Sequence, residues 1–350
     1  MESQCFCLHP KCICLLMSNI TQSQMQPLMN FCRSVNEMET LLIVLFALAV
    51  IANLINVTVL SYLHLNGQQR TATPTRGYLL SLAVSHALVV ILGIARLALP
   101  SESETFNNWA FFLLYDETLF LALNLCGIIL ILGLSVDRYI AVCQPHQYVS
   151  TESYERMKIF IAVAYILPGL LYMPHFFYEV PQHVTGDVWT LKTHTSLQKL
   201  LWNIWVITVQ LVHDVIPCLL IVGFNVKILC SVVRLGRTRD TMLSSTRALA
   251  GNRKEKRIVY LLLALTLNFL VTCIPGALFR GVYTWLGDFC YFNPEHETVM
   301  KVCLSLEIAG FTSDSVLYFA MDREYRDTFC YLVNSLIRRV KAQEAASGTS

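Results

Sequence analysis

The sequence predicts an all-α membrane protein, a bundle of seven transmembrane helices followed by an amphipathic helix at the membrane surface. Of the 350 residues, 55% are hydrophobic and only 14% are charged, whereas a soluble domain has about 25% charged residues. Seven apolar stretches are each about 20 residues or longer, which is enough to cross a bilayer as a helix. They lack the alternation of polar and apolar residues that the strands of a β-barrel would need.

The seven stretches form one domain between two terminal segments. We expect an extracellular tail over residues 1–37, the helical domain over 38–320, and an amphipathic helix with a cytoplasmic tail over 321–350. The spans are expected at 40–63, 78–99, 111–136, 159–178, 201–229, 258–280 and 299–320. Each should be helical, because lipid offers no hydrogen-bond partners to open backbone groups.

The last segment has the pattern of a helix that lies on the inner leaflet. Phe329, Leu332 and Leu336 share one face at helical spacing, with charged residues opposite. Cys330 on this helix is a candidate for palmitoylation, and an unmodified cysteine is the alternative.

Lysine and arginine residues indicate the orientation of the bundle. Most of the 26 lie in the loops on one side of the spans and in the C-terminal segment, and such residues remain on the cytoplasmic side. The amino terminus is then extracellular, and the plasma membrane is the expected location. The net charge is only +2 and no basic stripe is interleaved with aromatic residues, which argues against nucleic acid as a partner.

The parts expected outside contain candidate sites of modification. Asn19-Ile20-Thr21 is a glycosylation sequon in the amino-terminal tail. Cysteines on the oxidising side could pair, and Cys32 with Cys290 is the favoured combination because both would lie near outer ends of spans. For the cysteines at the start of the tail, an unpaired or lipidated state is the alternative.

Asp137-Arg138-Tyr139 ends the third apolar stretch. An acid beside an arginine at a membrane boundary is costly unless the charges are paired or used. This tripeptide at the end of the third of seven spans resembles the signature of rhodopsin-like (class A) G-protein-coupled receptors. In that family, carboxylates hold the arginine in the inactive state, and activation releases it into the cavity that receives the G protein. Glu255, at the inner end of the sixth span, is in the register of one such acid; a solvated loop charge is the alternative.

The resemblance covers most of the chain and implies a receptor, with no enzymatic activity, no cofactor and no metal. The partners it implies are an extracellular ligand, a heterotrimeric G protein, the lipid bilayer, arrestin and receptor kinases. It is closest to invertebrate neuropeptide receptors of the FMRFamide type, because residues 174–179 look like the end of the fourth span in that group. The expected function is therefore to transduce the binding of a neuropeptide to G proteins.

Further positions match the family in their order and spacing. Asn53 matches the asparagine of the first span, and Tyr318 matches the tyrosine of the seventh. Phe269 and Pro275 match the switch region of the sixth span, in which Cys273 stands in place of the usual tryptophan. The resemblance implies that these residues take part in activation.

Other positions depart from the family pattern. His86 stands where the family has a sodium-binding aspartate, and Asp314 stands where the seventh span usually has an asparagine. The two should face each other in the bundle core, and such a pair would neutralise itself without sodium. We therefore expect weak sodium dependence and sensitivity to pH; the alternative is a neutral His86 that donates one hydrogen bond. Leu113 replaces the cysteine that usually ties the second outer loop to the third span, so this loop should be mobile or held in another way.

The outer side of the bundle is acidic, which would attract a cationic ligand. Ligands bind in concave apolar sites with few polar anchors, and Phe120 replaces the aspartate of amine receptors, which argues against an amine. The candidate pocket residues are Asp116, Glu117, Phe120, Asn124, Glu179, Trp202, His213, Tyr283, Glu307 and Phe311. The alternative is a solvated acidic rim, with His213 packed in the interior.

Three other functions compete with a peptide receptor. A chemosensory receptor for another ligand and a receptor-like protein that no longer signals are the main alternatives. Retention of Asp137-Arg138-Tyr139 and of Glu255 argues against the second, because these residues serve coupling in the family. A membrane transporter is a weaker alternative, since transporters are built from inverted repeats and the chain contains no recognisable repeat.

Overall fold

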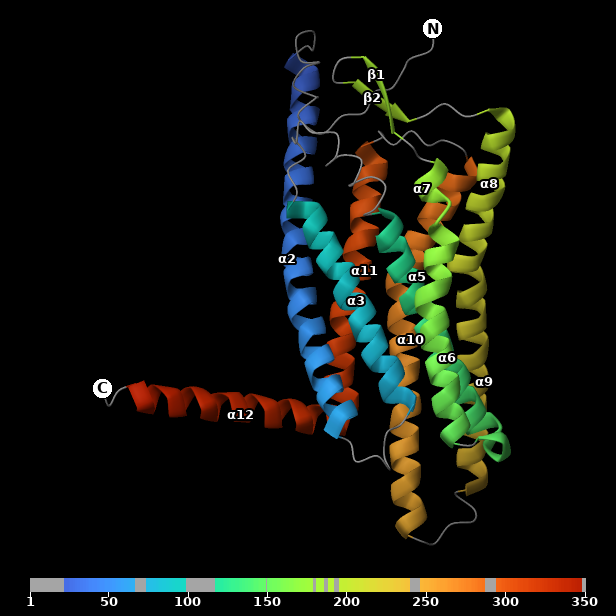
Figure 1. The fold of residues 1–350 in the computed structure, drawn as a ribbon, viewed down its shortest axis with the longest axis vertical. Helices are drawn as coiled ribbons and strands as arrows, with labels where there is room; N and C mark the ends of the chain where they lie inside the picture. Colours follow the sequence, from blue (N-terminus) through green and yellow to red (C-terminus); the bar gives the residue numbers. More distant parts are fainter. Residues whose placement is uncertain are drawn as a thin grey trace.

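The computed structural model describes residues 22–66, 74–98, 117–148, 150–178, 181–185, 188–191, 195–239, 246–286 and 294–347. They form a bundle of long helices with a two-stranded hairpin at one end and a helix that projects from the other end (Figure 1). The long helices are α2 (Gln22–Asn66), α3 (Pro74–Ala98), α5 (Glu117–Cys143), α6 (Ser150–Tyr172), α8 (Ser196–Gln210), α9 (Ile216–Arg239), α10 (Thr246–Leu286), α11 (Pro294–Met321) and α12 (Arg323–Ser347). The shorter elements are η3 (Pro145–Gln147), α7 (His175–Tyr178), β1 (Pro181–Thr185), β2 (Val188–Leu191) and η4 (Leu211–Val215).

Six segments of the described chain are long and apolar enough to cross a membrane. They are Thr40–Leu65, Pro74–Ile94, Thr118–Cys143, Leu200–Arg234, Arg257–Val282 and Thr298–Met321. Helix α6 completes the bundle against α5, although three charged residues within 155–158 shorten its apolar part. Beyond them, Ile159 and Ile166 are 62% and 61% exposed and lie two turns apart on one face, as lipid-facing residues do. The predicted seven-helix bundle is therefore confirmed.

Two of the spans are less regular than the sequence predicts. The fourth, expected at 159–178, is interrupted by a turn at Pro174 that separates α6 from α7. The fifth, expected at 201–229, contains the π-helical turn η4 shortly before Pro217. Proline has no N–H and its ring clashes with the carbonyl four residues earlier. One extra residue in the π turn relieves this conflict within a continuous span.

Helices α2 and α10 extend beyond the apolar stretches that predict them. Helix α2 begins at Gln22, within the segment expected as a tail over 1–37, and α10 runs well past both ends of 258–280. Helical hydrogen bonds are local, so a helix can continue from lipid into polar surroundings. The apolar pattern therefore locates the membrane-spanning part of these helices but not their ends.

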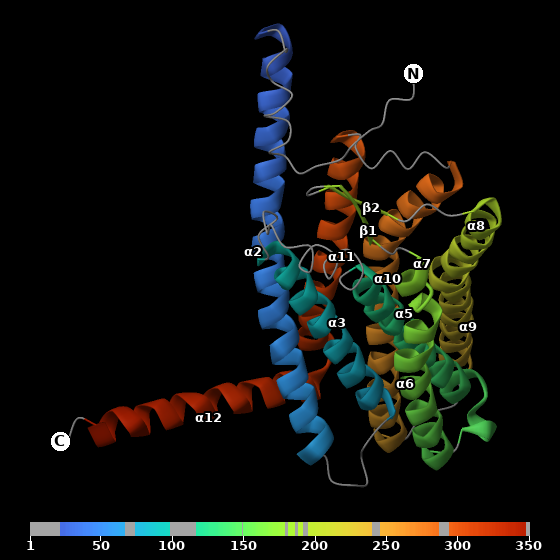
Figure 2. The same ribbon diagram turned by 45° about the horizontal axis from the view of Figure 1, so that its top comes forward.

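A β-hairpin adds to the predicted all-α architecture. Strands β1 and β2 pair antiparallel, with Pro181 opposite Leu191 and His183 opposite Trp189. Figure 2 places the hairpin at the end of the bundle where α10 ends and α11 begins. Backbone pairing thus joins residues 181–185 to 188–191 within the loop that the sequence predicts to be mobile or held in another way. Gly186-Asp187 between the strands is a hairpin signal that the sequence offers.

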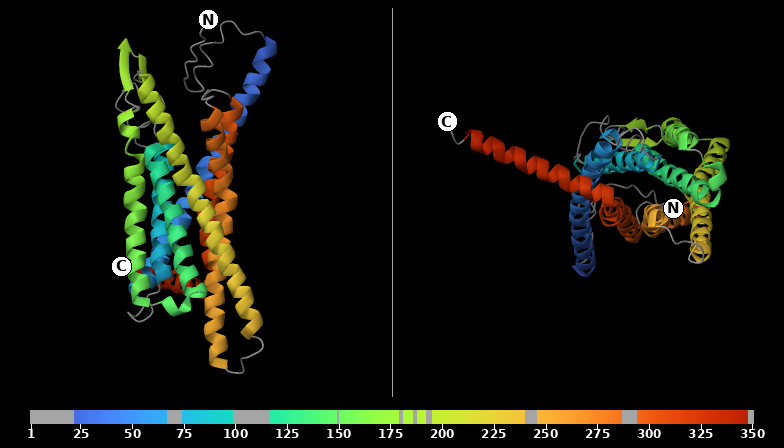
Figure 3. Two further views of the ribbon diagram at one scale, coloured as in Figure 1. Left: turned by 90° about the vertical axis from the view of Figure 1, so that its right-hand side faces the viewer. Right: turned by 90° about the horizontal axis from the view of Figure 1, so that it is seen from below.

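Helix α12 leaves the bundle as the amphipathic pattern predicts. The view from below in Figure 3 shows it projecting away from the other helices. Asp322 caps its first turn, since its Oδ1 accepts a hydrogen bond from the backbone N–H of Glu324 (2.9 Å). Leu336 and Val340 are exposed one turn apart, and such an apolar face suits a membrane surface. Cys330 is an exposed free thiol on this helix, and its palmitoylation stays a prediction.

Candidate functional site

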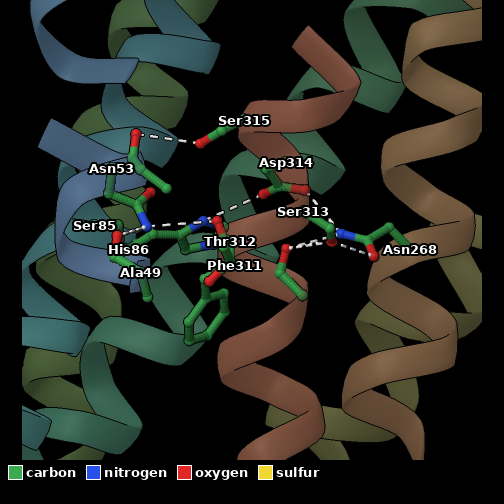
Figure 4. A network of polar contacts seen from close by, with 12 residues as sticks. Ala49, Asn53, Ser85, His86, Asn268, Phe311, Thr312, Ser313, Asp314 and Ser315 are labelled. Atoms are coloured by element: carbon green, nitrogen blue, oxygen red, sulfur yellow. Dashed lines mark hydrogen bonds and ion pairs between the residues drawn. The ribbon is translucent and has the colours of Figure 1, made fainter. Parts of the chain in front are cut away.

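A polar network in the middle of the bundle joins α3, α10 and α11. Nδ1 of His86 lies 3.3 Å from Oδ2 of Asp314, and both side chains are 8% exposed. The side-chain amide of Asn268 donates a hydrogen bond to Oδ1 of Asp314 (2.9 Å). Figure 4 shows Asp314 between these two residues. Both oxygens of this buried carboxylate therefore have a partner within the protein.

Helix α2 and a phenyl ring complete this network. The side-chain amide of Asn53 donates to the carbonyl of Ala49 (2.9 Å) and, more weakly, to that of Phe311 (3.4 Å). The ring of Phe311 lies over His86, with ring centroids 4.3 Å apart. Phe311, predicted to line the ligand pocket, thus packs against the central pair.

A small cavity lies beside the central pair. Its volume is about 20 Å³, and its lining includes Asp314, Thr272, Phe269 and Cys273. A cavity of this size is about as large as one water molecule. Cys273, where the family has a tryptophan, and Phe269 of the predicted switch region therefore border the polar network.

A charged cluster occupies the half of the bundle nearer the hairpin. Nη1 of Arg280 on α10 donates to Oε1 of Glu307 on α11 (3.1 Å), and its Nη2 lies 3.9 Å from Oδ1 of Asp214 in η4. The amide of Gln210 donates to Oδ2 of Asp214 (2.9 Å), and that of Asn124 makes a long hydrogen bond to Oε2 of Glu307 (3.5 Å). The fifth, sixth and seventh spans are thereby connected through one guanidinium.

Gly276 makes room for this cluster. A Cβ atom at Gly276 would lie 2.5 Å from Oε1 of Glu307 and 3.3 Å from Nη1 of Arg280. Because Glu307 is 1% exposed, its carboxylate has little space into which it could move. A glycine at position 276 is thus a condition for the Glu307–Arg280 contact.

Substituting Gly276→Ala is expected to destabilise the folded protein by about 1–3 kcal/mol, the usual cost of overpacking a core. The measurement is thermal unfolding of the purified protein. Gly169→Ala is the matched control, because a Cβ at Gly169 has nothing within 4 Å and alanine favours the helix. Equal unfolding temperatures for the two variants would contradict the close contact.

A second pair of charges lies at the opposite end of the bundle. Arg138 directs Nε (3.2 Å) and Nη2 (2.5 Å) to Oδ2 of Asp137. The other oxygen of Asp137 accepts a hydrogen bond from Ser153 of α6. Asp137 is 3% and Arg138 8% exposed, while Tyr139 packs on Phe224 of α9. The arginine is thus held by its neighbour in the sequence.

One face of α11 connects the hairpin end to the other end. Glu307, Phe311, Asp314 and Tyr318 follow at helical spacing, and all four are buried. Tyr318 packs on Tyr325 at the start of α12, with ring centroids 5.8 Å apart. A displacement of α11 at Glu307 would therefore act on the central pair and on the start of α12.

Comparison with known proteins identifies this architecture. Residues 55–317 match the family model of the 7 transmembrane receptor (rhodopsin family). The chain belongs to the rhodopsin family of seven-transmembrane receptors. Its members are G-protein-coupled receptors, which are not enzymes, and the multi-pass membrane location follows from the same match.

Individual relatives of this receptor are distant. A probable G-protein coupled receptor of Caenorhabditis elegans is 23% identical over 301 residues, which cover 81% of this chain and 66% of the relative. Rhodopsin of Petromyzon marinus is 24% identical, covering 74% of this chain and 71% of the relative. A neuromedin U receptor homolog of C. elegans is 22% identical, covering 73% and 70%. The matched region thus spans about two thirds of the length of these relatives.

The structure brings only some of the predicted pocket residues of the receptor together. Asn124 and Glu307 meet in the charged cluster, and Phe120 lies about one turn before Asn124 on α5. Trp202 instead packs against Trp205 and His175, whereas the buried His213 contacts the hydroxyl of Tyr172. Trp202 and His213 therefore belong to an aromatic contact between the fourth and fifth spans.

Several predicted residues fall outside the described part of the receptor. Asn19, Asp116, Glu179 and Cys290 lie outside the described residues altogether. Cys32, Glu117, Glu255 and Tyr283 lie on described helices, but their side chains are not among the described ones. The glycosylation site, the Cys32–Cys290 disulfide and the Glu255 clamp accordingly stay predictions.

The sequence interpretation missed two polar residues of the sites. Arg280 is the guanidinium of the charged cluster, and Asn268 supports Asp314. Both lie within apolar stretches, where ionisable residues face the bundle interior and pair with one another. That rule marks Asp214, inside the fifth span, as a functional candidate and could have identified Arg280 as its partner, but Asn268 has no comparable signal in the sequence.

Proposed function

We propose that this chain is a plasma-membrane G-protein-coupled receptor with an extracellular amino terminus, and that a peptide of the FMRFamide type is its ligand. The observation that carries the proposal is the pair of buried charged sites at opposite ends of one bundle. The Asp214–Arg280–Glu307 cluster lies in the half expected to face outward, and Asp137–Arg138 lies in the half expected to face inward. Ligand recognition is assigned to the first and G-protein coupling to the second.

Buried charges in a membrane domain are costly unless they serve a function. The outer cluster offers fixed charges to a polar ligand, and Phe120 takes the place of the aspartate that would mark an amine receptor. A relative is named as a neuromedin U receptor homolog, which favours a peptide among the ligands of the family. A receptor for another ligand class and a silent receptor-like protein are the alternatives.

At the inner end, Arg138 is the residue proposed to enter the interface with the G protein once Asp137 releases it. Arrestin and receptor kinases are proposed as further partners, and α12 is proposed to lie on the inner leaflet. Ligand binding would shift the population toward the released state by no more than its difference in affinity for the two states. Tyr318, Phe269 and Pro275 are proposed to move in this transition.

The proposal is tested by G-protein activation in cells that display the chain. An epitope tag at the amino terminus, stained on intact cells, reports surface expression and orientation. A panel of amidated invertebrate neuropeptides is applied to the natural chain and to Arg138→Ala. We expect a dose-dependent response to at least one peptide, and its loss, by roughly 100-fold or more in activity, in Arg138→Ala at equal surface expression; such a loss corresponds to about 3 kcal/mol.

Two results would count against this function. A tag that can be stained only in permeabilised cells would contradict the orientation. Normal surface expression without a response to any peptide, and without basal activity above that of Arg138→Ala, would favour another ligand class or a silent receptor.

A further inference from the structure

The charged cluster of the outer half contains more negative than positive groups. Among the described residues it holds two carboxylates, Asp214 and Glu307, and one guanidinium, Arg280. The other described donors are the amides of Gln210 and Asn124, which carry no charge. A buried carboxylate is stable only when it is paired or neutralised. Among these described residues, the cluster therefore has one cation fewer than it has carboxylates.

Arg280 divides its guanidinium unequally between the two acids. It makes a hydrogen bond of 3.1 Å to Glu307, whereas its nearest approach to Asp214 is 3.9 Å. Glu307 is also the more deeply buried, with a side chain 1% exposed against 13% for Asp214. The side chain of Arg280 is 24% exposed, which makes it the most exposed of the three charged side chains.

We infer that the cluster is a binding subsite for a cationic group, an ammonium or a guanidinium, which takes the place of Arg280 at Glu307. Arg280 then keeps Asp214 as its partner, and each carboxylate has one cation. Charged hydrogen bonds to a carboxylate are among the strongest that a side chain makes, and a guanidinium can form two of them side by side. This inference rests on the proposed receptor function and names the chemistry of the ligand group that reaches deepest.

The exchange of partners would also couple binding to the helices. In the described structure Arg280 joins α10 to α11 through Glu307 and approaches η4 through Asp214. A ligand cation at Glu307 removes the first of these connections and leaves the second. Helix α10 is thereby released from α11 at the outer end. A neutral or anionic group could not replace Arg280 in this way.

The test uses probes that share one alkyl chain and differ only in their head group. Hexylguanidinium, hexylamine, hexanol and hexanoate are added to the purified full-length receptor, and thermal unfolding is followed. A solute that binds only the folded state raises the unfolding temperature. We expect both cations to stabilise the receptor more than hexanol does, and hexanoate to have no greater effect than hexanol.

Two variants should change the apparent Kd of hexylguanidinium in opposite directions. Glu307→Gln should weaken binding by about tenfold or more, the loss of one charged hydrogen bond. Arg280→Gln should strengthen it, because the competing cation is gone.

Glu152→Gln, which removes an exposed acid at the start of α6, is the matched control and should leave the Kd unchanged. Asp214→Asn should weaken binding with Glu307 intact, because it removes the acid that holds Arg280 once the ligand cation takes Glu307. This variant replaces Glu307→Gln if the latter does not fold.

Cation binding that persists in both Glu307→Gln and Asp214→Asn would overturn the inference, as would cations that act no differently from hexanol. Stabilisation by hexanoate that disappears in Arg280→Gln would assign the site to an anion instead. The readout needs no G protein, so a receptor that binds the cations without signalling contradicts only the proposed function. A receptor that signals but fails the probe test contradicts only the cation site.

Discussion

Replacing His86 by Asp and Asp314 by Asn in one receptor is expected to create a dependence on sodium that should be weak in the natural chain. In the structure His86 lies 3.3 Å from one oxygen of Asp314, and Asn268 donates to the other. Both oxygens of the carboxylate thus have protein partners, and a protonated His86 would occupy the place of a cation. The double variant restores the arrangement of the family, with an acid in α3 and an amide in α11.

The measurement is thermal unfolding of the purified receptor in sodium chloride and in choline chloride of equal concentration. Sodium at ten times its Kd would stabilise the double variant by about 1.4 kcal/mol relative to choline. The natural chain should unfold at the same temperature in both salts. Asp314→Asn alone is the matched control, because it leaves His86 facing an amide and no acid for sodium. Stabilisation of the natural chain by sodium but not choline would show that the central pair does not replace the ion.

The central pair could be predicted because the resemblance to the family places both positions in the bundle core. His86 and Asp314 were recognised as departures from a family arrangement, and a carboxylate in the core needs a partner. Asn268 could not be predicted, because its contact depends on how far α10 is rotated toward α11. Packing of side chains between helices sets that rotation, and the apolar pattern of a single span does not contain it.

In the fold, too, some features follow from the pattern of the sequence and others depend on contacts that this pattern does not contain. Length and hydrophobicity predict the spans, because each span must satisfy its own backbone within lipid. They do not predict where α2 and α10 end, since those ends lie beyond the apolar stretch. The hairpin of β1 and β2 is held by backbone pairing outside the spans, and only Gly186-Asp187 indicates it. Local signals at prolines likewise account for the turn at Pro174 and for η4 before Pro217.

The charged cluster shows why composition alone misleads about a site. An acidic outer side predicts a ligand cation that meets free carboxylates, yet Arg280 already occupies Glu307. In the proposed site, recognition is a competition between Arg280 and the cation of the ligand for the carboxylate of Glu307. The sequence contains both charges, but their distance of 3.1 Å depends on the contact of α10 with α11 and on the missing side chain of Gly276.

Removing the carboxylate that holds Arg138 is expected to raise signalling without ligand. Asp137 accepts two hydrogen bonds from Arg138 and one from Ser153, and it is 3% exposed. Asp137→Asn keeps an acceptor for Ser153 but removes the charge that holds the guanidinium. If the substitution lowers the free-energy difference that favours the resting state by about 1.4 kcal/mol, a small active population rises about tenfold. Basal G-protein activity at matched surface expression measures this change.

Glu152→Gln provides the comparison for this variant, because Glu152 is an exposed acid at the same end of the bundle and forms a partly exposed pair with Arg156 (3.7 Å). Exposed pairs contribute little to a conformational equilibrium, so the control should signal like the natural chain. Ser153→Ala removes the neutral contact alone and should raise basal activity less than Asp137→Asn does. If Asp137→Asn left basal activity unchanged while responses to the ligand persisted, another acid would have to restrain Arg138, and Glu255→Gln would then be the variant that raises it.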